Sequence, residues 1–283
     1  MGLSHPSLAR PVSLSTIAIV GNGNLTWHFS RVLGGRCVVA GHRREDDSGD
    51  KSPVPYAQLS NYPLEAVFLA VPDNEIAAAS QQLRGILQPH IPIFHTSGAT
   101  PADRISGYFQ HRGVLWPIRS LRRGEAVSHW RDLPLVIYAS TEPGATYLRR
   151  LAAELSDTVT WLDDLQRAQL HLAAVFSNNF VTALYDIAYQ LCDAKDIPFE
   201  LLLPIIRHTA HSQDGRRPAV RQTGAAVRGD TATMERHLSL LQRPEYRQLY
   251  RDISRLIFEY RLPKDDPDLR RDANDDLEDK GIA

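Results

Sequence analysis

The stretch that decides the fold is residues 16–26, TIAIVGNGNLT. Its first five residues, Thr16 to Val20, are the β-branched and apolar types of a short buried strand. Gly21 and Gly23 follow directly, and the spacing of apolar residues predicts a helix over 24–33. A glycine turn between a strand and a helix lets a phosphate group approach backbone N–H groups at the positive end of the helix. The stretch therefore predicts a phosphate-binding turn at the edge of an α/β sheet.

Strand and helix signals alternate as far as Leu162. Continuous apolar runs, typical of strands covered on both faces, predict strands at 36–40, 66–71, 91–95, 113–116, 135–139 and 158–162. Helices are expected at 74–87 and 143–155, and a further one is expected to begin after Thr100. After a loose leader at 1–14, we therefore expect a Rossmann dinucleotide-binding domain with a parallel sheet over 15–162.

After Leu162 the strand signals stop and helical patterns replace them. The helices are expected at 163–194, 198–209, 231–241 and 244–260, with a polar stretch at 211–229. They predict an all-α second domain over 163–262, which we expect to help bind substrate and to form dimers. The tail at 263–283 has eight acidic and four basic residues and is predicted to be disordered.

Composition restricts the partners and the compartment. The formal net charge is -1 and mean hydropathy is -0.30, so no global basic field favours nucleic acid. No apolar run has the length of a membrane span. The two cysteines, Cys37 and Cys192, cannot build a disulfide framework or a metal cluster. A protein of the reducing cytoplasm, without a metal, is expected.

The second strand predicts which dinucleotide is bound. The glycine-turn residues expected to hold the diphosphate are Gly21, Asn22, Gly23, Asn24 and Leu25, with Thr26 in place of the usual third small residue. The next strand ends in His42, Arg43 and Arg44, where an NAD-binding protein usually has an acid. Guanidinium groups suit a 2′-phosphate, so NADP is favoured over NAD. Alternatively, the two arginines pair with the acids at 45–47 on a solvated loop.

Further candidates stand where the next strands end, because the carboxyl ends of parallel strands line the ligand crevice. Val71 and Pro72 are expected to pack against the cofactor, and Asp73 is expected to cap the following helix. The substrate or nicotinamide is expected to meet residues of the next two strand ends, namely His95, Ser97, Gly98 and Arg119. Alternatively, His95 only forms a hydrogen bond within its loop, and Arg119 only forms a surface ion pair.

The long helix at 163–194 carries a polar stripe. In an α-helix His171 and Asn178 share a face, and Asn179 lies about 80° away from His171. Hydride transfer to a carbonyl or imine needs a proton donor, and imidazole titrates in a suitable range. We therefore expect His171 to be the acid or base and Asn179 to orient it. The alternative is a buried histidine that only bonds to a neighbouring helix.

The order of these segments resembles a known group of bacterial proteins. The motifs are the glycine turn with His28, then 71–73, 95–98, His171 with Asn179, and QTGAAVRGD at 222–230 followed by His237. They resemble Rossmann-like proteins whose C-terminal helical part is domain of unknown function 2520. That group is similar to the superfamily of the 6-phosphogluconate dehydrogenase C-terminal domain, which includes pyrroline-5-carboxylate reductases and β-hydroxyacid dehydrogenases.

The resemblance implies an NADP-dependent oxidoreductase and a dimer, without implying a substrate. The β-hydroxyacid dehydrogenases have a catalytic lysine in the region where His171 stands, which puts that reaction in doubt here. The family usually has proline where this chain has Ala225. Gln222, Thr223 and Arg228 could face an anionic substrate, whereas Asp230 is expected to cap the next helix rather than to act as an acid.

The preferred hypothesis is hydride transfer between NADP(H) and a small polar metabolite. Three alternatives stay open at this point. The chain could be an NADP(H)-binding sensor without turnover, because it shows no recognised catalytic residue. It could use a deazaflavin. A nucleic-acid-binding protein using 207–228 is the weakest alternative, because aromatic residues do not alternate with the basic ones.

Overall fold

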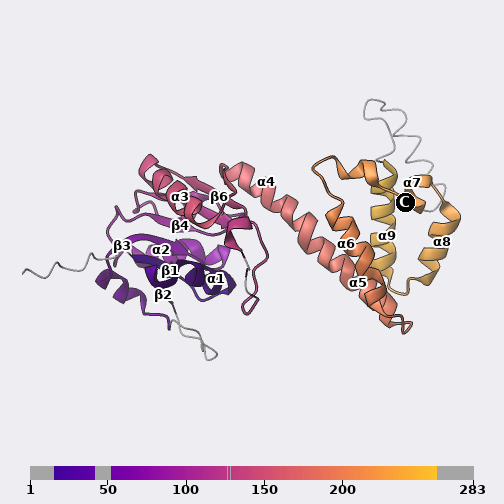
Figure 1. The fold of residues 1–283 in the computed structure, drawn as a ribbon, viewed down its shortest axis with the longest axis horizontal. Coiled ribbons are helices and arrows are strands. Elements are labelled where there is room, and N and C mark those ends of the chain that lie inside the picture. The colour runs from indigo at the N-terminus through magenta and orange to yellow at the C-terminus, as the bar shows by residue number, and fades with distance from the viewer. Residues whose placement is uncertain (1–15, 42–51, 126, 128, 260–283) are drawn as a thin grey trace, which may run out of the picture. The chain divides into compact units, whose positions relative to one another are not determined.

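The computed structural model describes residues 16–41, 52–125, 127 and 129–259. The chain divides into two compact units, one up to Phe180 and one from Val181 (Figure 1). The domain boundary that the sequence predicts after Leu162 stays a prediction. The two units are described separately below.

The first unit contains a seven-stranded sheet. In chain order the strands are β1 (Thr16–Val20), β2 (Cys37–Ala40), β3 (Leu64–Leu69), β4 (Ile93–His95), β5 (Arg112–Pro117), β6 (Leu135–Ala139) and β7 (Val159–Trp161). Their order in the sheet is β2-β1-β3-β4-β5-β6-β7. The α/β fold class is confirmed, and every predicted strand of this unit forms.

The expected parallel sheet contains one antiparallel pair. β5 and β6 run antiparallel, with Gly113 opposite Ala139, whereas all the other neighbouring pairs are parallel. A parallel pair needs a crossover, usually a helix, whereas the described residues between β5 and β6 form a short 3-10 turn, Trp130–Asp132, and no longer helix. The glycine at this seam is needed because a Cβ at Gly113 would collide with the carbonyl oxygen of Tyr138.

Helices cover both faces of the sheet (Figure 1). One core contains Phe29 of α1 (Asn24–Leu33) and Leu148 of α3 (Glu142–Leu155), together with Phe68. The opposite core contains Ile76 of α2 (Ile76–Leu83). Successive strand residues alternate between the two cores, as the pleat of a strand requires.

Two local expectations of this unit are wrong. Only a 3-10 turn, Ala102–Arg104, forms where a helix was expected after Thr100, and the N–H of its first residue donates to a carboxylate described below. Asp73 does not cap a helix with its side chain: it is the first residue of the 3-10 turn Asp73–Glu75, which leads into α2.

The long helical stretch is not one regular α-helix. α4 (Asp164–Ala174) starts with a capping box in which Asp163 accepts from the N–H of Gln166. A wider π-helical turn, Val175–Phe180, follows and ends the first unit. The expected uninterrupted helix is therefore wrong over these six residues.

The second unit is helical, as expected. Its helices are α5 (Val181–Asp193), α6 (Leu203–His211), α7 (Ala225–Arg228), α8 (Thr231–Leu240) and α9 (Pro244–Glu259). Asp230 caps α8 by accepting from the N–H of Thr233 at 3.1 Å, which confirms its predicted role. Throughout the described ranges, helices fall short of the length and apolar character needed to cross a membrane.

Candidate functional site

The glycine turn has the conformation that the sequence predicts. Gly21 has φ +122°, a left-handed value, and its N–H donates to Ala40 of β2 at 2.9 Å. A Cβ at Gly21 would collide with the carbonyl oxygen of Ala70 and lie 3.2 Å from Val71. β1 lies between β2 and β3 in the sheet, so the connection after β1 leads to one side of β1 and the connection after β2 leads to the other side. The glycine turn lies at this reversal of strand order. This point of an α/β sheet is where ligands bind at the strands' carboxyl ends.

The start of α1 has neither a capping side chain nor an acid. Gly23 is its N-cap and supplies no side chain, and no acid stands in the first turn. The first backbone N–H groups of a helix lack partners inside the helix. Thr26, at the third small-residue position, is only 2% exposed, and its Oγ1 has no hydrogen-bond partner. Thr26 therefore occupies the place of the usual third small residue with its hydroxyl buried.

The segment after β5 lies against this turn, which the sequence did not predict. Arg123 donates from Nη2 to Asn22 Oδ1 at 2.8 Å and from its backbone N–H to Asn24 Oδ1 at 3.3 Å. The buried His28 contacts the carbonyl oxygen of Arg122 through Nε2 at 2.9 Å. These contacts place a guanidinium group beside the asparagines of the glycine turn.

The loop after β4 is an ordered polar turn. His95 has no exposed surface, and its ring contacts the Pro101 carbonyl at 3.3 Å and accepts from the Ser97 N–H at 3.2 Å. Ser97 Oγ accepts from the N–H of Thr100 at 3.0 Å. Burial, and then the positive charge of Arg167, lower the pKa of His95 to about 4. His95 is therefore neutral at neutral pH and bonds within the loop.

Arg167 of α4 ties this loop to the helix. Its side chain has no exposed surface and donates to the Thr100 carbonyl at 2.5 Å and to Asp164 at 2.7 Å. Asp164 in turn accepts from the Ala102 N–H at 3.2 Å. Nε and Nη1 of Arg167 are buried without a hydrogen-bond partner. A fully buried arginine is uncommon, and here it fixes the loop that carries Ser97.

His171 comes close to the same loop. Its ring centroid lies 5.5 Å from that of Trp116 on β5. A Cβ at Gly98 would lie 2.5 Å from His171 Cδ2 and 2.6 Å from Trp116, so only glycine fits between the loop and these rings. The half-buried imidazole of His171 therefore stands at the carboxyl ends of β4 and β5.

The two asparagines of the π-helical turn face a different partner. Asn178 donates to Ser120 Oγ at 2.8 Å and to Asn179 Oδ1 at 3.2 Å. The structure therefore gives Asn179 a contact with Asn178 rather than with His171. Asn179 lies within this π-helical turn, so the angle from His171 expected for a regular α-helix does not apply. Such turns interrupt α-helices frequently at functional sites.

The remaining predicted residues lie elsewhere. His42, Arg43 and Arg44 lie outside the described residues. The side chain of Arg119 is exposed. Pro72 follows Val71 and leads into the 3-10 turn before α2. Within the second unit Gln222, Thr223 and Arg228 are exposed, and His237 contacts the Tyr250 hydroxyl at 2.8 Å.

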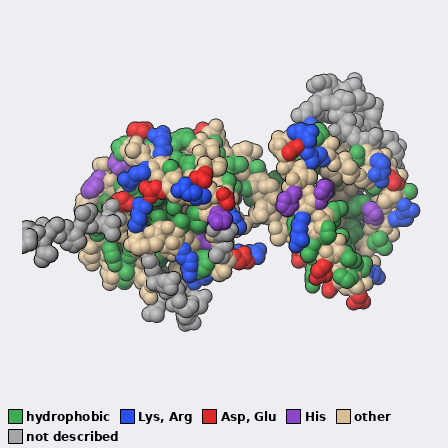
Figure 2. Space-filling view, viewed as in Figure 1, with side chains coloured by type: hydrophobic (Ala, Val, Ile, Leu, Met, Phe, Trp, Pro, Cys, Tyr) green, Lys and Arg blue, Asp and Glu red, His purple; other side chains and the backbone are tan. Residues whose placement is uncertain are grey.

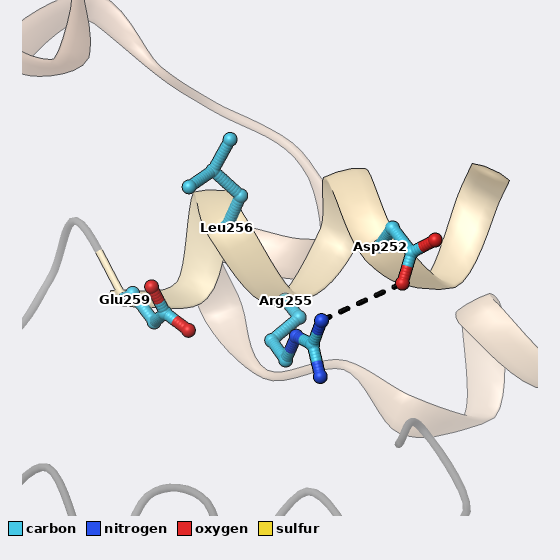
Figure 3. Close-up of a pocket in the computed structure, with 4 residues that line it drawn as sticks. All are labelled: Asp252, Arg255, Leu256 and Glu259. Carbon is cyan, nitrogen blue, oxygen red and sulfur yellow. Dashed lines mark ion pairs between the residues drawn. The ribbon is translucent and has the colours of Figure 1, made fainter.

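One hollow of the second unit lies on α9 (Figure 3). Its volume is about 330 Å³, and all four lining residues come from this helix: Asp252, Arg255, Leu256 and Glu259. Arg255 pairs with Asp252 at 3.5 Å. A hollow formed by one helix and containing none of the predicted site residues is not the candidate site.

Comparisons with known proteins agree with this architecture. Residues 133–257 match the family model "Domain of unknown function (DUF2520)". The match begins before β6 and so includes the end of the sheet as well as the helical unit. No curated protein matches the chain.

Solved structures resemble the chain over most of its length. A "putative NADP oxidoreductase" from Bacteroides fragilis is 29% identical, with a TM-score of 0.78 over 87% of this chain and 98% of that one. A protein from Thermotoga maritima is 22% identical, with a TM-score of 0.62 over 87% and 98%. The pyrroline carboxylate reductase of Plasmodium falciparum, solved with NADP, shares the fold at 8% identity, with a TM-score of 0.51 over 87% and 99%.

The family resemblance that the motif order indicates is therefore confirmed. Residues 133–257 are similar to the DUF2520 model, and the chain as a whole is similar in fold to the Bacteroides fragilis protein.

Proposed function

We propose that the chain is an oxidoreductase that binds a nicotinamide dinucleotide at the glycine turn and acts on a small polar metabolite with a carbonyl or imine group. The observation that carries the proposal is the turn itself. Gly21 has a left-handed φ and no room for a Cβ, and α1 starts directly behind it without a capping side chain. This geometry fits a diphosphate, whose oxygens would accept from the backbone N–H groups of residues 22–25.

NADP(H) is the proposed form of the cofactor. His42, Arg43 and Arg44 follow Gly41, which comes directly after β2. Two guanidinium groups there would bind a 2′-phosphate and would leave NAD(H) without a matching charge. The name of the Bacteroides fragilis relative supports this choice. Val71 and Pro72 would flank the cofactor from the end of β3.

His171 is the proposed proton donor or acceptor. The cofactor would supply or accept the hydride. His171 would transfer a proton to or from the carbonyl oxygen or imine nitrogen, which is the role that a half-buried imidazole at the strand ends can perform. Gly98 packs directly against this ring, where a side chain would not fit. Ser97 and Asn179 are proposed to orient the substrate.

Activity and binding measured together test this assignment. His171→Ala should reduce turnover by about 100-fold or more while the NADPH dissociation constant stays within about twofold. His90→Ala, at an exposed histidine before β4, is the matched control and should keep both values. Unchanged turnover in His171→Ala would refute the catalytic role. Absence of any nicotinamide nucleotide binding to the wild type would refute the proposed function as a whole.

Substrate binding by polar groups of the second unit is part of the same proposal. Gln222, Thr223 and Arg228 are exposed and stand in the most specific motif of the family resemblance. An arginine and two neutral hydrogen-bonding groups suit a carboxylate-bearing metabolite. Arg119, exposed after β5, is the candidate of the first unit.

A second copy of the chain is the proposed partner of the helical unit. Ten large apolar side chains of this unit are 37% exposed or more, among them Leu201 at 70% and Ile205 at 62% (Figure 2). Patches of this kind mark interfaces. Leu201→Asp with Ile205→Asp should convert dimers to monomers in sedimentation, whereas Gln213→Asp at a polar exposed site should not. A wild type that sediments as a monomer would contradict the dimer.

A further inference from the structure

The buried arginine of α4 is anchored at two points. The side chain of Arg167 has no exposed surface, although arginine is among the residue types that proteins bury least. Its Nη2 donates both to the Thr100 carbonyl and to the carboxylate of Asp164. Burying an unpaired charge is costly, so these two bonds allow the guanidinium to lie inside the protein. The guanidinium is therefore held in one place by both partners.

The two partners of Arg167 join the loop after β4 to the start of α4. Thr100 belongs to this loop and is 9% exposed, whereas Asp164 is the first residue of α4. Asp164 also accepts from the N–H of Ala102, which follows the same loop. Hydrogen bonds depend on direction as well as on distance. This network therefore restricts how α4 can rotate or slide against the loop.

His171 lies one helical turn beyond Arg167. Residues four positions apart are neighbours on one face of a helix, and both residues belong to α4. A Cβ at Gly98 would lie 2.5 Å from His171 Cδ2, so the imidazole lies against the same loop. The loop after β4 therefore meets α4 at two points, the guanidinium at one and the imidazole at the other.

Apolar packing also holds α4 to the sheet, but it restricts the helix less. Leu170 packs against the cluster that contains Ala102 and Trp116. Apolar attraction is non-directional, so this packing alone leaves the helix free to rotate slightly. Such a rotation would carry the imidazole away from the loop and from Trp116. The bonds of Arg167 oppose it.

We propose that Arg167 is a positioning residue, which holds the His171 imidazole at the carboxyl ends of β4 and β5 through its bonds to the Thr100 carbonyl and Asp164. The inference rests on the proposed function, in which His171 transfers a proton. Arg167 is buried and acts on the reaction only through the place of that imidazole. A displacement of about 1 Å can lower the rate of an enzyme about 100-fold, so turnover depends on this placement.

Proton NMR reports the position of His171 without any substrate. The ring current of Trp116, whose centroid is 5.5 Å away, shifts the signal of the His171 Cδ2 proton. His171→Gln assigns the signal by removing it, and Trp116→Leu shows where it lies without the ring current. In Arg167→Met, which lacks the charge and the donors, the signal should move toward its position in Trp116→Leu. The displacement should be smaller in Arg167→Lys, because an ammonium group still donates.

Two controls separate positioning from a general loss of stability. Leu148→Ala removes a fully buried side chain of α3 from the core on one face of the sheet. Arg149→Ala removes an arginine that is 54% exposed and pairs with Glu142. The His171 signal should stay at its wild-type position in both controls. An unmoved signal in Arg167→Met, or an equal displacement in Leu148→Ala, overturns the proposal.

A second variant keeps the test decisive if Arg167→Met does not fold. Asp164→Asn leaves the guanidinium in place and removes the charge of its partner, so the bond between them weakens. The His171 signal should then move in the same direction as expected for Arg167→Met, by less. An unmoved signal in Asp164→Asn overturns the proposal in that case.

Nucleotide binding distinguishes failure of this inference from failure of the proposed function. The NADPH dissociation constant of Arg167→Met should stay within about twofold of the wild type, because Arg167 bonds to the loop after β4. If the wild type binds neither NADPH nor NADH but the His171 signal depends on Arg167, the positioning role is supported and the proposed function fails. If NADPH binds and the signal does not depend on Arg167, the proposed function stands and the positioning role fails.

Discussion

The sheet unit and the helical unit bury their apolar side chains to different extents. In the sheet unit Phe68 and Phe94 have no exposed surface, and two cores cover the two faces of the sheet. Among the described residues of the helical unit, the buried large apolar side chains are Met234, Leu238 and Leu241. Leu201 and Leu240 there are 70% and 69% exposed.

This difference shows where each unit obtains its stability. Burial of apolar surface is the main favourable contribution to folding. The sheet unit buries most of its large apolar side chains, whereas the helical unit leaves much of its apolar surface uncovered. All four tryptophans lie in the sheet unit, so tryptophan fluorescence follows that unit and circular dichroism follows the helices of both.

The largest expected effect is that of removing a core side chain. Phe68→Ala should lower the free energy of unfolding of the sheet unit by about 4 kcal/mol, because a fully buried ring is replaced by a cavity. Leu201→Ala, at an exposed residue of the helical unit, should cost less than about 1 kcal/mol in dilute solution. Chemical denaturation followed by fluorescence and circular dichroism measures both. Equal costs would contradict the contrast between the units.

The second effect compares a buried ion pair with an exposed one. Arg167→Ala should cost about 3 kcal/mol, because it removes the side chain that joins α4 to the Thr100 carbonyl and Asp164. In the helical unit Arg221 pairs with Asp214 at 2.6 Å, and the two side chains are 35% and 42% exposed. Arg221→Ala breaks this pair and should lower the free energy of unfolding by less than about 1 kcal/mol. Urea denaturation at constant pH measures the two. A small loss in Arg167→Ala would show that its buried charge is not needed to hold the loop.

The smallest of the three effects is a pH dependence specific to the sheet unit. The folded-state pKa of His95 is lowered to about 4 by burial and by Arg167, whereas an unfolded histidine titrates near 6.5. Between these values the unfolded chain binds more protons, so stability falls as pH falls. From pH 7.5 to 5 the loss due to His95 should be about 2 kcal/mol.

His95→Asn provides the control for that prediction. The unfolding free energy of the wild type minus that of His95→Asn should decrease by about 2 kcal/mol from pH 7.5 to pH 5. Fluorescence-detected denaturation at each pH gives the values. Parallel pH profiles for the two proteins would mean that His95 is not buried in its neutral form.

Most of the fold could be predicted because the strands are covered on both faces. Continuous apolar runs mark such strands, and Leu135–Ala139 was expected with its observed bounds. Such runs do not indicate whether neighbouring strands are parallel or antiparallel. The antiparallel pairing of β5 with β6 depends on the connection after β5, so it could not be predicted from the runs. The π-helical turn at Val175–Phe180 was also missed, because the apolar spacing of its residues is close to that of an α-helix.

The candidate site could be predicted only where local sequence determines it. The glycine turn needs a backbone that only glycine adopts, so Gly21 was identifiable from its place after β1. Arg123 contacts Asn22, which lies 101 positions earlier in the chain, and Arg167 contacts Thr100, which lies 67 positions earlier. No local sequence pattern reveals contacts over such separations. The cluster of arginines at 119–123 was the available signal for the segment after β5.

The bond between Ala102 and Asp164 makes one backbone proton informative. The N–H of Ala102 donates to a carboxylate that lies 62 positions later in the chain. Its exchange with deuterium therefore requires the loop after β4 and the start of α4 to separate. The exchange rate of this single proton would report how often the histidine-bearing helix detaches from the sheet.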